Sequence, residues 1–239
     1  MRFVILAGGF GTRLGNMNKA LIELPNGKPL IEYITTKIFE LNPEKPVIVM
    51  TNVHYAYEIW EWCESFNKDR KKVVLFIEPS FTPSNRLETV SSIRYIMEFI
   101  EDDLYIIFVD NFFTFRLPEL WKDCPGICCA IVKVPKKNIK NRLGNVLPDE
   151  KGNVLRFEEK PDKPFSDYAL TGILFIRNNE NIRSVMDEFI EKFGSGSFGR
   201  FFKYVVENYP ELVKVLTIDG QWLDVGTPET LKLLEKVSV

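Results

Sequence analysis

Residues 2–14 read Arg-Phe-Val-Ile-Leu-Ala-Gly-Gly-Phe-Gly-Thr-Arg-Leu, and this stretch decides the fold. Its first half, Arg2–Ala7, is apolar, rich in β-formers and followed by glycines, which predicts a buried strand ending in a tight loop. Glycines directly after a strand let the backbone approach a phosphate closely, and their clustered N–H groups bind anions. Arg13 and Lys19 follow at a spacing that lets both cations reach one polyphosphate. The opening therefore predicts a strand and a phosphate-binding loop.

Two well-known nucleotide-binding loops do not match this stretch. A Walker loop needs Gly-Lys-Ser/Thr after four spacer residues, and that run is absent. A dinucleotide-binding loop needs G-x-G-x-x-G, but Gly15 falls one residue late, and the next strand ends Val49-Met50-Thr51 without an acid. A plain glycine turn stays open as an alternative, although it would not need the two cations.

The first half of the chain alternates strand and helix patterns. Apolar, β-rich runs indicate strands at 2–7, 47–50, 73–77 and 104–109, and helical spacing of apolar residues indicates helices at 29–41, 55–66 and 87–100. Strands that are apolar along their whole length are typical of parallel sheets covered on both faces. We therefore expect an α/β fold with a doubly wound, mostly parallel sheet and a ligand site at the carboxyl ends of its strands.

The second half is less regular. Strands are indicated at 127–134, 145–147, 154–158, 170–176 and 213–218, helices at 182–193, 198–209 and 228–236, and a hairpin turn at 149–152. No repeat or low-complexity linker divides the chain. We expect one domain over 1–239, with a nucleotide-binding half at 1–115 and a small mixed β lobe for the second substrate within 116–239.

The bulk composition excludes several classes of protein. A net charge of −2 gives no reason to bind nucleic acid, and no run approaches the roughly 20 apolar residues that span a bilayer. The first apolar run is too short for a signal peptide, so we expect a cytoplasmic protein. The four cysteines lack a C-x-x-C pair and are expected to be reduced, mostly buried thiols. His54 is the only histidine, which excludes mechanisms that need two imidazoles.

Two further segments carry acidic groups in informative places. Phe108-Val-Asp-Asn111 ends the fourth predicted strand, so Asp110 is expected at the ligand edge of the sheet. Trp222-Leu-Asp-Val-Gly-Thr-Pro228 carries a second aspartate, Asp224, shortly before the last predicted helix. Between them, a predicted hairpin ends in Glu159-Lys160-Pro161.

These motifs together resemble those of the sugar-1-phosphate nucleotidyltransferases. This family includes glucose-1-phosphate thymidylyltransferases and uridylyltransferases and mannose-1-phosphate guanylyltransferases. The resemblance begins with LAGGFGTRL at 6–14, Lys19 and Gly27-Lys-Pro-Leu-Ile-Glu-Tyr33, and continues in order through 108–111, 144–161, 171–173 and 222–228. It implies a Rossmann-like nucleotidyltransferase that joins an NTP to a sugar 1-phosphate and releases pyrophosphate.

The resemblance also implies a role for each matched residue. The catalytic residues would be Arg13, Lys19, Asp110 and Asp224, and the two aspartates would bind Mg²⁺. The nucleotide would contact Leu6, Ala7, Gly8, Gly9, Gly11, Thr12, Arg13, Glu78, Asn85, Leu87 and Thr89. The sugar phosphate would contact Gly144, Glu159, Lys160, Thr171 and Gly172. Within this last group, Glu159 would bind sugar hydroxyls and Lys160 the phosphate.

Two departures from the family pattern leave the substrates open. The loop from Arg13 to Ala20 is short, as in molybdopterin guanylyltransferases and small cytidylyltransferases, and Glu88 stands where the family has a glycine near the base. The favoured pair is dTTP or UTP with glucose 1-phosphate. The alternatives are another phosphorylated acceptor (phosphocholine, inositol 1-phosphate or molybdopterin) and a non-catalytic subunit that senses nucleotide sugars. A choline box could draw on Phe112, Phe113, Phe115 and Trp121, and a homo-oligomer stays open.

Overall fold

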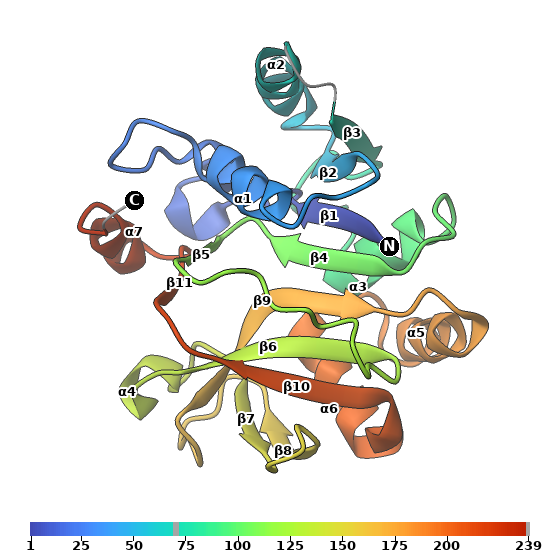
Figure 1. Cartoon of the computed structure of the whole chain (residues 1–239). Helices are drawn as coiled ribbons and strands as arrows, with labels where there is room; N and C mark the ends of the chain where they lie inside the picture. Colours follow the sequence, from blue (N-terminus) through green and yellow to red (C-terminus); the bar gives the residue numbers. More distant parts are fainter. Residues whose placement is uncertain (69–71, 238–239) are drawn as a thin grey trace. The chain divides into compact units, whose positions relative to one another are not determined.

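The computed structural model describes residues 1–68 and 72–237 (Figure 1). The chain forms two compact units that interleave along the sequence. The first unit contains Met1–Arg86, Tyr105–Leu117 and Gln221–Val239, and the second contains Leu87–Leu104 and Pro118–Gly220. Segments from both ends of the sequence therefore build the first unit.

Four strands form the sheet of the first unit, in the order β4-β1-β2-β3. They are β1 (Arg2–Leu6), β2 (Val47–Asn52), β3 (Val73–Glu78) and β4 (Leu104–Phe108), which enters this unit at Tyr105. β2 runs parallel to both β1 and β3, with Val4 opposite Ile48. The chain order proceeds outward from β1 to β3 and then returns to the other side of β1. This reversal between β1 and β4 is the place where open α/β sheets bind their ligands.

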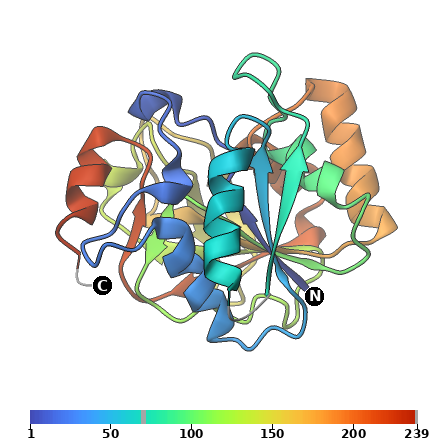
Figure 2. The same cartoon turned by 90° about the horizontal axis from the view of Figure 1, so that it is seen from above.

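Two helices of the first unit pack against these strands. Helix α1 (Leu30–Phe39) lies against β1, and helix α2 (Ala56–Asn67) lies against β2 and β3, as Figure 2 shows for α2 in cyan. The helical spacing of apolar residues predicted α1 correctly, because Leu30, Ile34 and Ile38 are all fully buried. Successive right-handed crossovers in one direction place such helices on the same face of a sheet.

A second, small sheet in the first unit consists of β5 (Asn111–Phe113) and β11 (Trp222–Asp224). These antiparallel strands bring residues from the two halves of the sequence side by side, and α7 (Pro228–Leu234) follows directly. Thr227 and Thr230 form a capping box at the start of α7. Sequence patterns did not predict β5 or β11, because three-residue strands are too short to show alternation.

The second unit contains a mixed sheet in the order β10-β6-β9, with β7 on β9 and β8 on β7. Its strands are β6 (Ile127–Lys133), β7 (Asn145–Pro148), β8 (Val154–Glu158), β9 (Tyr168–Ile176) and β10 (Val213–Ile218). Its helices are α3 (Thr89–Ile96), α4 (Lys136–Ile139), α5 (Glu180–Phe193) and α6 (Phe198–Asn208), of which α3, α5 and α6 pack together. β6 pairs with β10 in parallel and with β9 antiparallel.

The α/β fold predicted from the sequence is confirmed, and most element boundaries agree within two residues. The main difference is α3, which was predicted to span 87–100 and is shorter at both ends. Its C-terminal end tightens into i→i+3 hydrogen bonds, from Glu98 N to Tyr95 O and from Phe99 N to Ile96 O, which closes the helix early.

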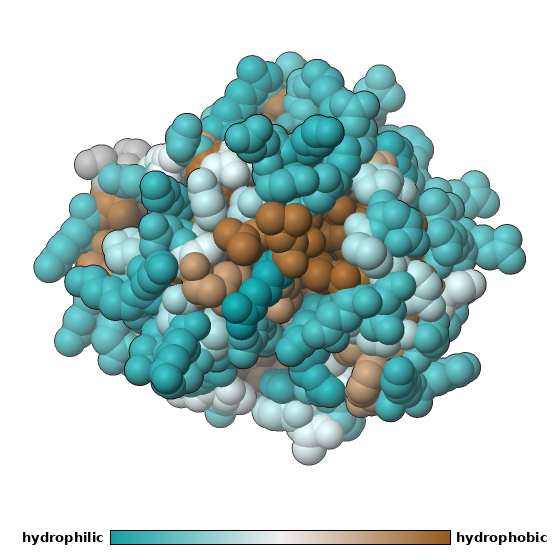
Figure 3. All heavy atoms as spheres, turned by 90° about the horizontal axis from the view of Figure 1, so that it is seen from below, coloured by the Kyte–Doolittle hydropathy of each residue, from teal (hydrophilic) through white to brown (hydrophobic). Residues whose placement is uncertain are grey.

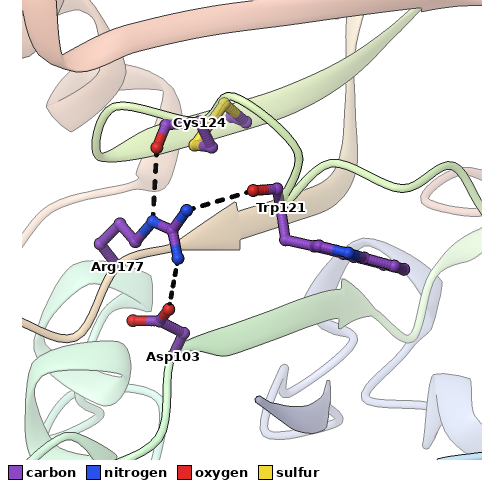
Figure 4. Close-up of a disulfide and its surroundings, with 5 residues drawn as sticks. Asp103, Trp121, Cys124 and Arg177 are labelled. Atoms are coloured by element: carbon purple, nitrogen blue, oxygen red, sulfur yellow. Dashed lines mark hydrogen bonds and ion pairs between the residues drawn. A yellow bond between two sulfur atoms is a disulfide. The ribbon is translucent and has the colours of Figure 1, made fainter.

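The expectation of four reduced thiols is wrong for two of them. Cys124 and Cys128 form a disulfide, because the turn before β6 folds back and brings their Cα atoms to 5.8 Å (Figure 4). A spacing of four residues does not reveal such a turn in the sequence. Cys63 and Cys129 are buried free thiols, and burial together with nearby Glu64 raises the pKa of Cys63 to about 12.

Arginine 177 ties this turn to the rest of the second unit (Figure 4). Its guanidinium donates to the carbonyls of Trp121 and Cys124 at 3.2 and 3.3 Å and pairs with Asp103 at 2.7 Å. Asp103 also accepts from Asn178 N at 2.8 Å. Arg177 therefore connects the start of β4 with the turn that carries the disulfide.

The second unit also exposes several large apolar side chains. Leu147 on β7, Leu155 on β8 and Leu216 on β10 are among the most exposed leucines. Figure 3 shows apolar side chains gathered among hydrophilic ones on the lower face, the side on which Figure 1 draws β7 and β8.

None of the helices within residues 1–68 and 72–237 has the length and apolar character that crossing a membrane requires.

Candidate active site

The predicted glycine loop leaves the carboxyl end of β1 and contacts the carboxyl ends of β2 and β3. Ala7 N continues the ladder to Met50 O at 2.7 Å, and Asn52 Nδ2 donates to Gly8 O at 2.8 Å. A Cβ on Gly8 would lie 3.0 Å from Glu78 Oε1, so the glycine leaves room for this buried carboxylate. Gly9 has open space around its Cα. The carboxyl ends of three strands therefore shape this loop.

Gly11 closes the loop in a conformation that other residues resist. Its φ is +59°, and a Cβ there would lie 2.0 Å from Met17 O. Its carbonyl accepts from Leu14 N at 2.8 Å and from Asn16 N at 3.0 Å. The backbone therefore turns sharply here and leads through the short helix η1 (Thr12–Leu14).

The loop continues into a second short helix, η2 (Lys19–Leu21), which carries the predicted lysine. The Asn18 side chain caps this helix through Ala20 N at 3.2 Å and donates to Glu58 Oε2 on α2 at 2.8 Å. Tyr55 Oη lies 2.7 Å from Asn16 O and 3.0 Å from Phe10 O. Helix α2 and the residue before it thus hold the position of Lys19.

Lys19 and Asp110 form an ion pair at the carboxyl ends of β1 and β4. Lys19 Nζ lies 2.9 Å from Asp110 Oδ2, and both side chains are mostly buried. Burial lowers the pKa of Lys19, but the Asp110 carboxylate and the more distant Asp224 outweigh it and raise the pKa above its ordinary value. Arg13 opposes this rise, which places its charge in the same neighbourhood.

Asp224 reaches this place through the β5–β11 pair. It lies opposite Asn111 in the antiparallel register, and Val225 N donates to Asp110 O at 2.7 Å. Its side chain packs beside Gly226, where a Cβ would lie 3.2 Å from Oδ1. Asp110, directly before β5, and Asp224, at the end of β11, therefore come from distant parts of the sequence, and both carboxylates act on the Lys19 ammonium.

A hydrogen-bonded chain of side chains orients the Asp110 carboxylate. Trp222 Nε1 donates to Asn111 Oδ1 at 2.7 Å, and Asn111 Nδ2 donates to Asp110 Oδ1 at 3.1 Å and to Phe108 O at 3.2 Å. Lys19 holds the other oxygen of the same carboxylate. Sequence analysis missed Asn111 and Trp222 as site residues, although both stand inside the motifs that it quoted.

Asp110 and Asp224 suit a hard divalent cation that takes its remaining ligands from the phosphates of a bound nucleotide. In the described part of the chain, no three His, Cys, Asp or Glu side chains group in a way that could hold a metal ion. Two carboxylates do come together, Asp110 and Asp224. Mg²⁺ is commonly held by one or two carboxylates together with substrate phosphates and water. The donor set therefore fits Mg²⁺ delivered with a nucleotide.

The other predicted nucleotide contacts differ in their burial, in their hydrogen bonds and in the unit to which they belong. Glu78 is buried beside Gly8. Asn85 Oδ1 accepts from Phe81 N at 3.2 Å and from Thr82 N at 2.7 Å, so this side chain stabilises its own loop. Thr89, the first residue of α3, and Leu87, two residues before it, belong to the second unit.

The predicted acceptor residues Glu159 and Lys160 follow β8 in the second unit. Lys160 Nζ lies 3.4 Å from Glu159 Oε1, and Lys160 adopts a left-handed φ of +50°. Such a conformation is uncommon for a residue other than glycine and turns the chain sharply before Pro161. Gly144 lies close by, since a Cβ there would be 3.3 Å from Glu159 Oε2.

Buried Asn145 organises the loop that follows Lys160. Its Nδ2 donates to Ser166 Oγ and Tyr168 O, both at 2.8 Å, and its Oδ1 accepts from Phe165 N at 2.8 Å. Thr171 uses its hydroxyl inside the sheet instead, donating to Ala130 O at 2.8 Å. Gly172 is buried in β9. The acceptor roles of Thr171 and Gly172 stay predictions.

Comparisons with known proteins point to one family along almost the whole chain. The family described as nucleotidyl transferase matches residues 2–236. The D-glycero-alpha-D-manno-heptose 1-phosphate guanylyltransferase of Campylobacter jejuni is 27% identical over 240 residues, which cover 96% of each chain. The glucose-1-phosphate adenylyltransferase of Thermotoga neapolitana is also 27% identical, over 94% of this chain and 57% of its own. The chain thus spans little more than half of that second relative.

Among solved structures, a UDP-glucose pyrophosphorylase complexed with UDP-glucose has the same fold. It superposes with a TM-score of 0.77 at 15% sequence identity and covers 98% of this chain and 96% of its own.

Proposed function

The chain belongs to the nucleotidyl transferase family, and from this premise we propose that it transfers a nucleoside monophosphate from an NTP to a sugar 1-phosphate. The observation that carries the proposal is the cluster of Asp110, Lys19 and Asp224 beside the glycine loop, between β1 and β4. Such a cluster offers both a cation site and a positive charge where a polyphosphate would lie. A turn without a ligand would need neither.

The reaction balances without a protein nucleophile. An oxygen of the acceptor phosphate attacks the α-phosphorus, a new O–P bond forms, and the bond from the α-phosphorus to the bridging oxygen breaks. Pyrophosphate leaves with that electron pair. A phosphate monoester is largely ionised near neutral pH, so no side chain has to remove a proton. Catalysis then depends on positioning and charge neutralisation.

Each cluster residue has a distinct task in this scheme. Asp110 and Asp224 hold Mg²⁺, which when bound neutralises charge on the phosphate oxygens. Lys19 and Arg13 attract the phosphates and offset the charge that gathers on the departing pyrophosphate. The backbone N–H groups from Gly8 to Gly11 bind the polyphosphate.

The acceptor is bound by the second unit. Glu159 accepts hydrogen bonds from sugar hydroxyls, and Lys160 pairs with the phosphate. A carboxylate and a lysine that already lie 3.4 Å apart suit a ligand that carries hydroxyls next to a phosphate. Lys160→Ala should raise the KM for the sugar phosphate about ten-fold while the KM for the NTP changes little. An equal rise in both constants would contradict this assignment.

The proposed substrates are dTTP or UTP with glucose 1-phosphate. GTP with a manno-heptose 1-phosphate is the second candidate, because the guanylyltransferase relative matches this chain from end to end. The proposed place of action is the cytoplasm.

A pyrophosphate-release screen tests the proposal. ATP, GTP, CTP, UTP and dTTP would each be paired with glucose, mannose and manno-heptose 1-phosphates, inositol 1-phosphate and phosphocholine. Each pair would be assayed with and without Mg²⁺. We expect one sugar 1-phosphate pair to dominate and EDTA to abolish it. Release with phosphocholine alone would support the alternative acceptor, and no release with any pair would support a sensing subunit.

Asp110→Asn provides the matched control for this screen. It keeps the size of the side chain and removes its charge, so turnover should fall by at least about 100-fold. The melting temperature should fall as well, because Lys19 loses its partner, but the protein should still fold and unfold cooperatively. Near-normal activity in this variant would remove Asp110 from the site.

A further inference from the structure

Glycine 199 lies in the first turn of α6, directly beneath the Glu159 carboxylate. A Cβ on Gly199 would lie 2.0 Å from Glu159 Oε2, 2.4 Å from Cδ and 2.9 Å from Oε1. No ordinary side chain fits at such distances. The whole carboxylate therefore rests in the space that the missing Cβ leaves.

The match between strand β8 and helix α6 explains why the carboxylate reaches this point. Phe157 lies near the end of β8, and Glu159 follows two residues later, just past the strand. Gly199 and Phe202 are three residues apart on one face of α6. The Phe157 and Phe202 rings pack edge to face at 4.9 Å, and both residues are buried. This ring pair holds β8 against α6. Two residues after Phe157 and three residues before Phe202, the Glu159 carboxylate meets Gly199.

The neighbours of Glu159 restrict its other positions. Gly144 leaves room for the Phe157 ring and for the carboxylate, since a Cβ on this glycine would lie 2.8 Å from the ring and 3.3 Å from Glu159 Oε2. The first turn of a helix also favours a negative charge, which suits a carboxylate above Gly199. The Glu159 side chain keeps 22% of its surface exposed, so its oxygens remain open to a ligand.

We propose that Gly199 is a positioning residue that sets where Glu159 reads the hydroxyls of the acceptor, and so helps to determine acceptor specificity. This inference rests on the proposed function. A larger residue at position 199 would push the carboxylate outward and change which hydroxyls it meets. Since the displaced atoms are the end of a flexible side chain, the fold itself would persist.

Gly199→Ala is the test. Alanine favours helix more than glycine does, whereas its Cβ must push the Glu159 carboxylate aside. The two effects oppose each other, so the melting temperature should change by only a few degrees. The KM for the sugar 1-phosphate should rise about ten-fold, which is the effect of one weakened charged hydrogen bond, with little change in the KM for the NTP. Glu207→Ala, at an exposed position of the same helix, is the control and should leave both constants unchanged.

A double-mutant cycle separates this inference from the proposed function. In a Glu159→Ala background the clash is gone, so Gly199→Ala should stabilise the protein more than it does in the wild type and should raise the acceptor KM no further. Additive effects on melting temperature would overturn the contact. An unchanged acceptor KM in active Gly199→Ala protein would overturn the positioning role alone. Wild-type protein that releases no pyrophosphate would refute the proposed function and the acceptor role with it, while the unfolding cycle would still decide the contact.

Discussion

A lysine holds the carboxylate that the proposed mechanism assigns to a metal ion. Lys19 Nζ lies 2.9 Å from Asp110 Oδ2, in a partly buried setting where an unpaired charge would be costly. The ammonium neutralises Asp110 in the absence of substrate. In the proposed mechanism, Lys19 would release this carboxylate to Mg²⁺ and pair with the phosphates instead. The same residue would then contribute to stability in the free protein and to catalysis in the complex.

Lys19→Met should separate these two tasks. Turnover should fall about 100-fold, because a charge that stabilises the transition state is lost. The pKa of Lys19 is raised in the folded protein, so its ion pair contributes stability below the unfolded pKa of about 10.4 and loses it as pH rises through the higher folded value. Denaturant unfolding should show a constant difference between wild type and variant from pH 6 to 9 and a shrinking one above about pH 10.4. A difference that grows there would contradict the pairing.

Trp222 acts on Asp110 through Asn111. Trp222→Phe keeps an aromatic ring but removes the N–H that holds Asn111 Oδ1 at 2.7 Å. The amide then loses its fixed orientation, and the Mg²⁺ concentration for half-maximal rate should rise about ten-fold, as is typical when the support of a metal ligand is removed. Titration of Mn²⁺ in the presence of NTP, followed by electron paramagnetic resonance, should show the same weakening. Unaltered Mn²⁺ affinity would leave Trp222 a purely structural role.

At the scale of elements, the loop after β1 depends on one backbone conformation. Gly11→Ala combines a left-handed φ with a Cβ 2.0 Å from a backbone oxygen, and backbone cannot yield as a side chain can. We expect a loss of at least about 2 kcal/mol in the free energy of unfolding and a loss of NTP binding. Gly9→Ala, with no atom near the added methyl, should leave stability almost unchanged. Equal destabilisation by both would show that the loop geometry is unimportant.

The turn before β6 has two stabilising elements, a disulfide and Arg177. A disulfide that closes so short a loop contributes about 2 kcal/mol in the chain-entropy view. Cys124→Ser with Cys128→Ser should therefore lower the melting temperature by a few degrees and leave turnover unchanged. Arg177→Met, which leaves Asp103 without its cation, should destabilise more. If the double serine variant is fully folded and still turns over more slowly, this turn contributes to the reaction.

At the scale of the whole molecule, the proposed reaction needs no general base, and this predicts how its rate depends on pH. His54 is exposed and contacts the rings of Phe10 and Tyr55, and the proposed reaction does not use it. The rate should rise with pH through about 6, the second pKa of the acceptor phosphate, and then level off. His54→Gln should give the same profile. A profile that moves with this substitution would assign His54 to the chemistry.

The sequence alone determined the class of fold and most of the proposed site. Long apolar runs and helical periodicity depend on neighbours along the chain, so β1, α1 and β4 could be predicted, and glycines with nearby cations indicated a phosphate loop. Asp110 and Asp224 were found because each stands within a recognisable motif. The proposed roles of all these residues await the experiments above.

Only the tertiary structure decided which residues meet. β5 and β11 are too short to show a pattern, and it is their pairing that brings Asp224 beside Asp110. The Cys124–Cys128 bond depends on a turn, and the contact of Glu159 with Gly199 depends on how a strand packs on a helix. Periodicity records which face of an element is buried but not what that face touches. Such contacts arise only when segments distant in sequence are packed together.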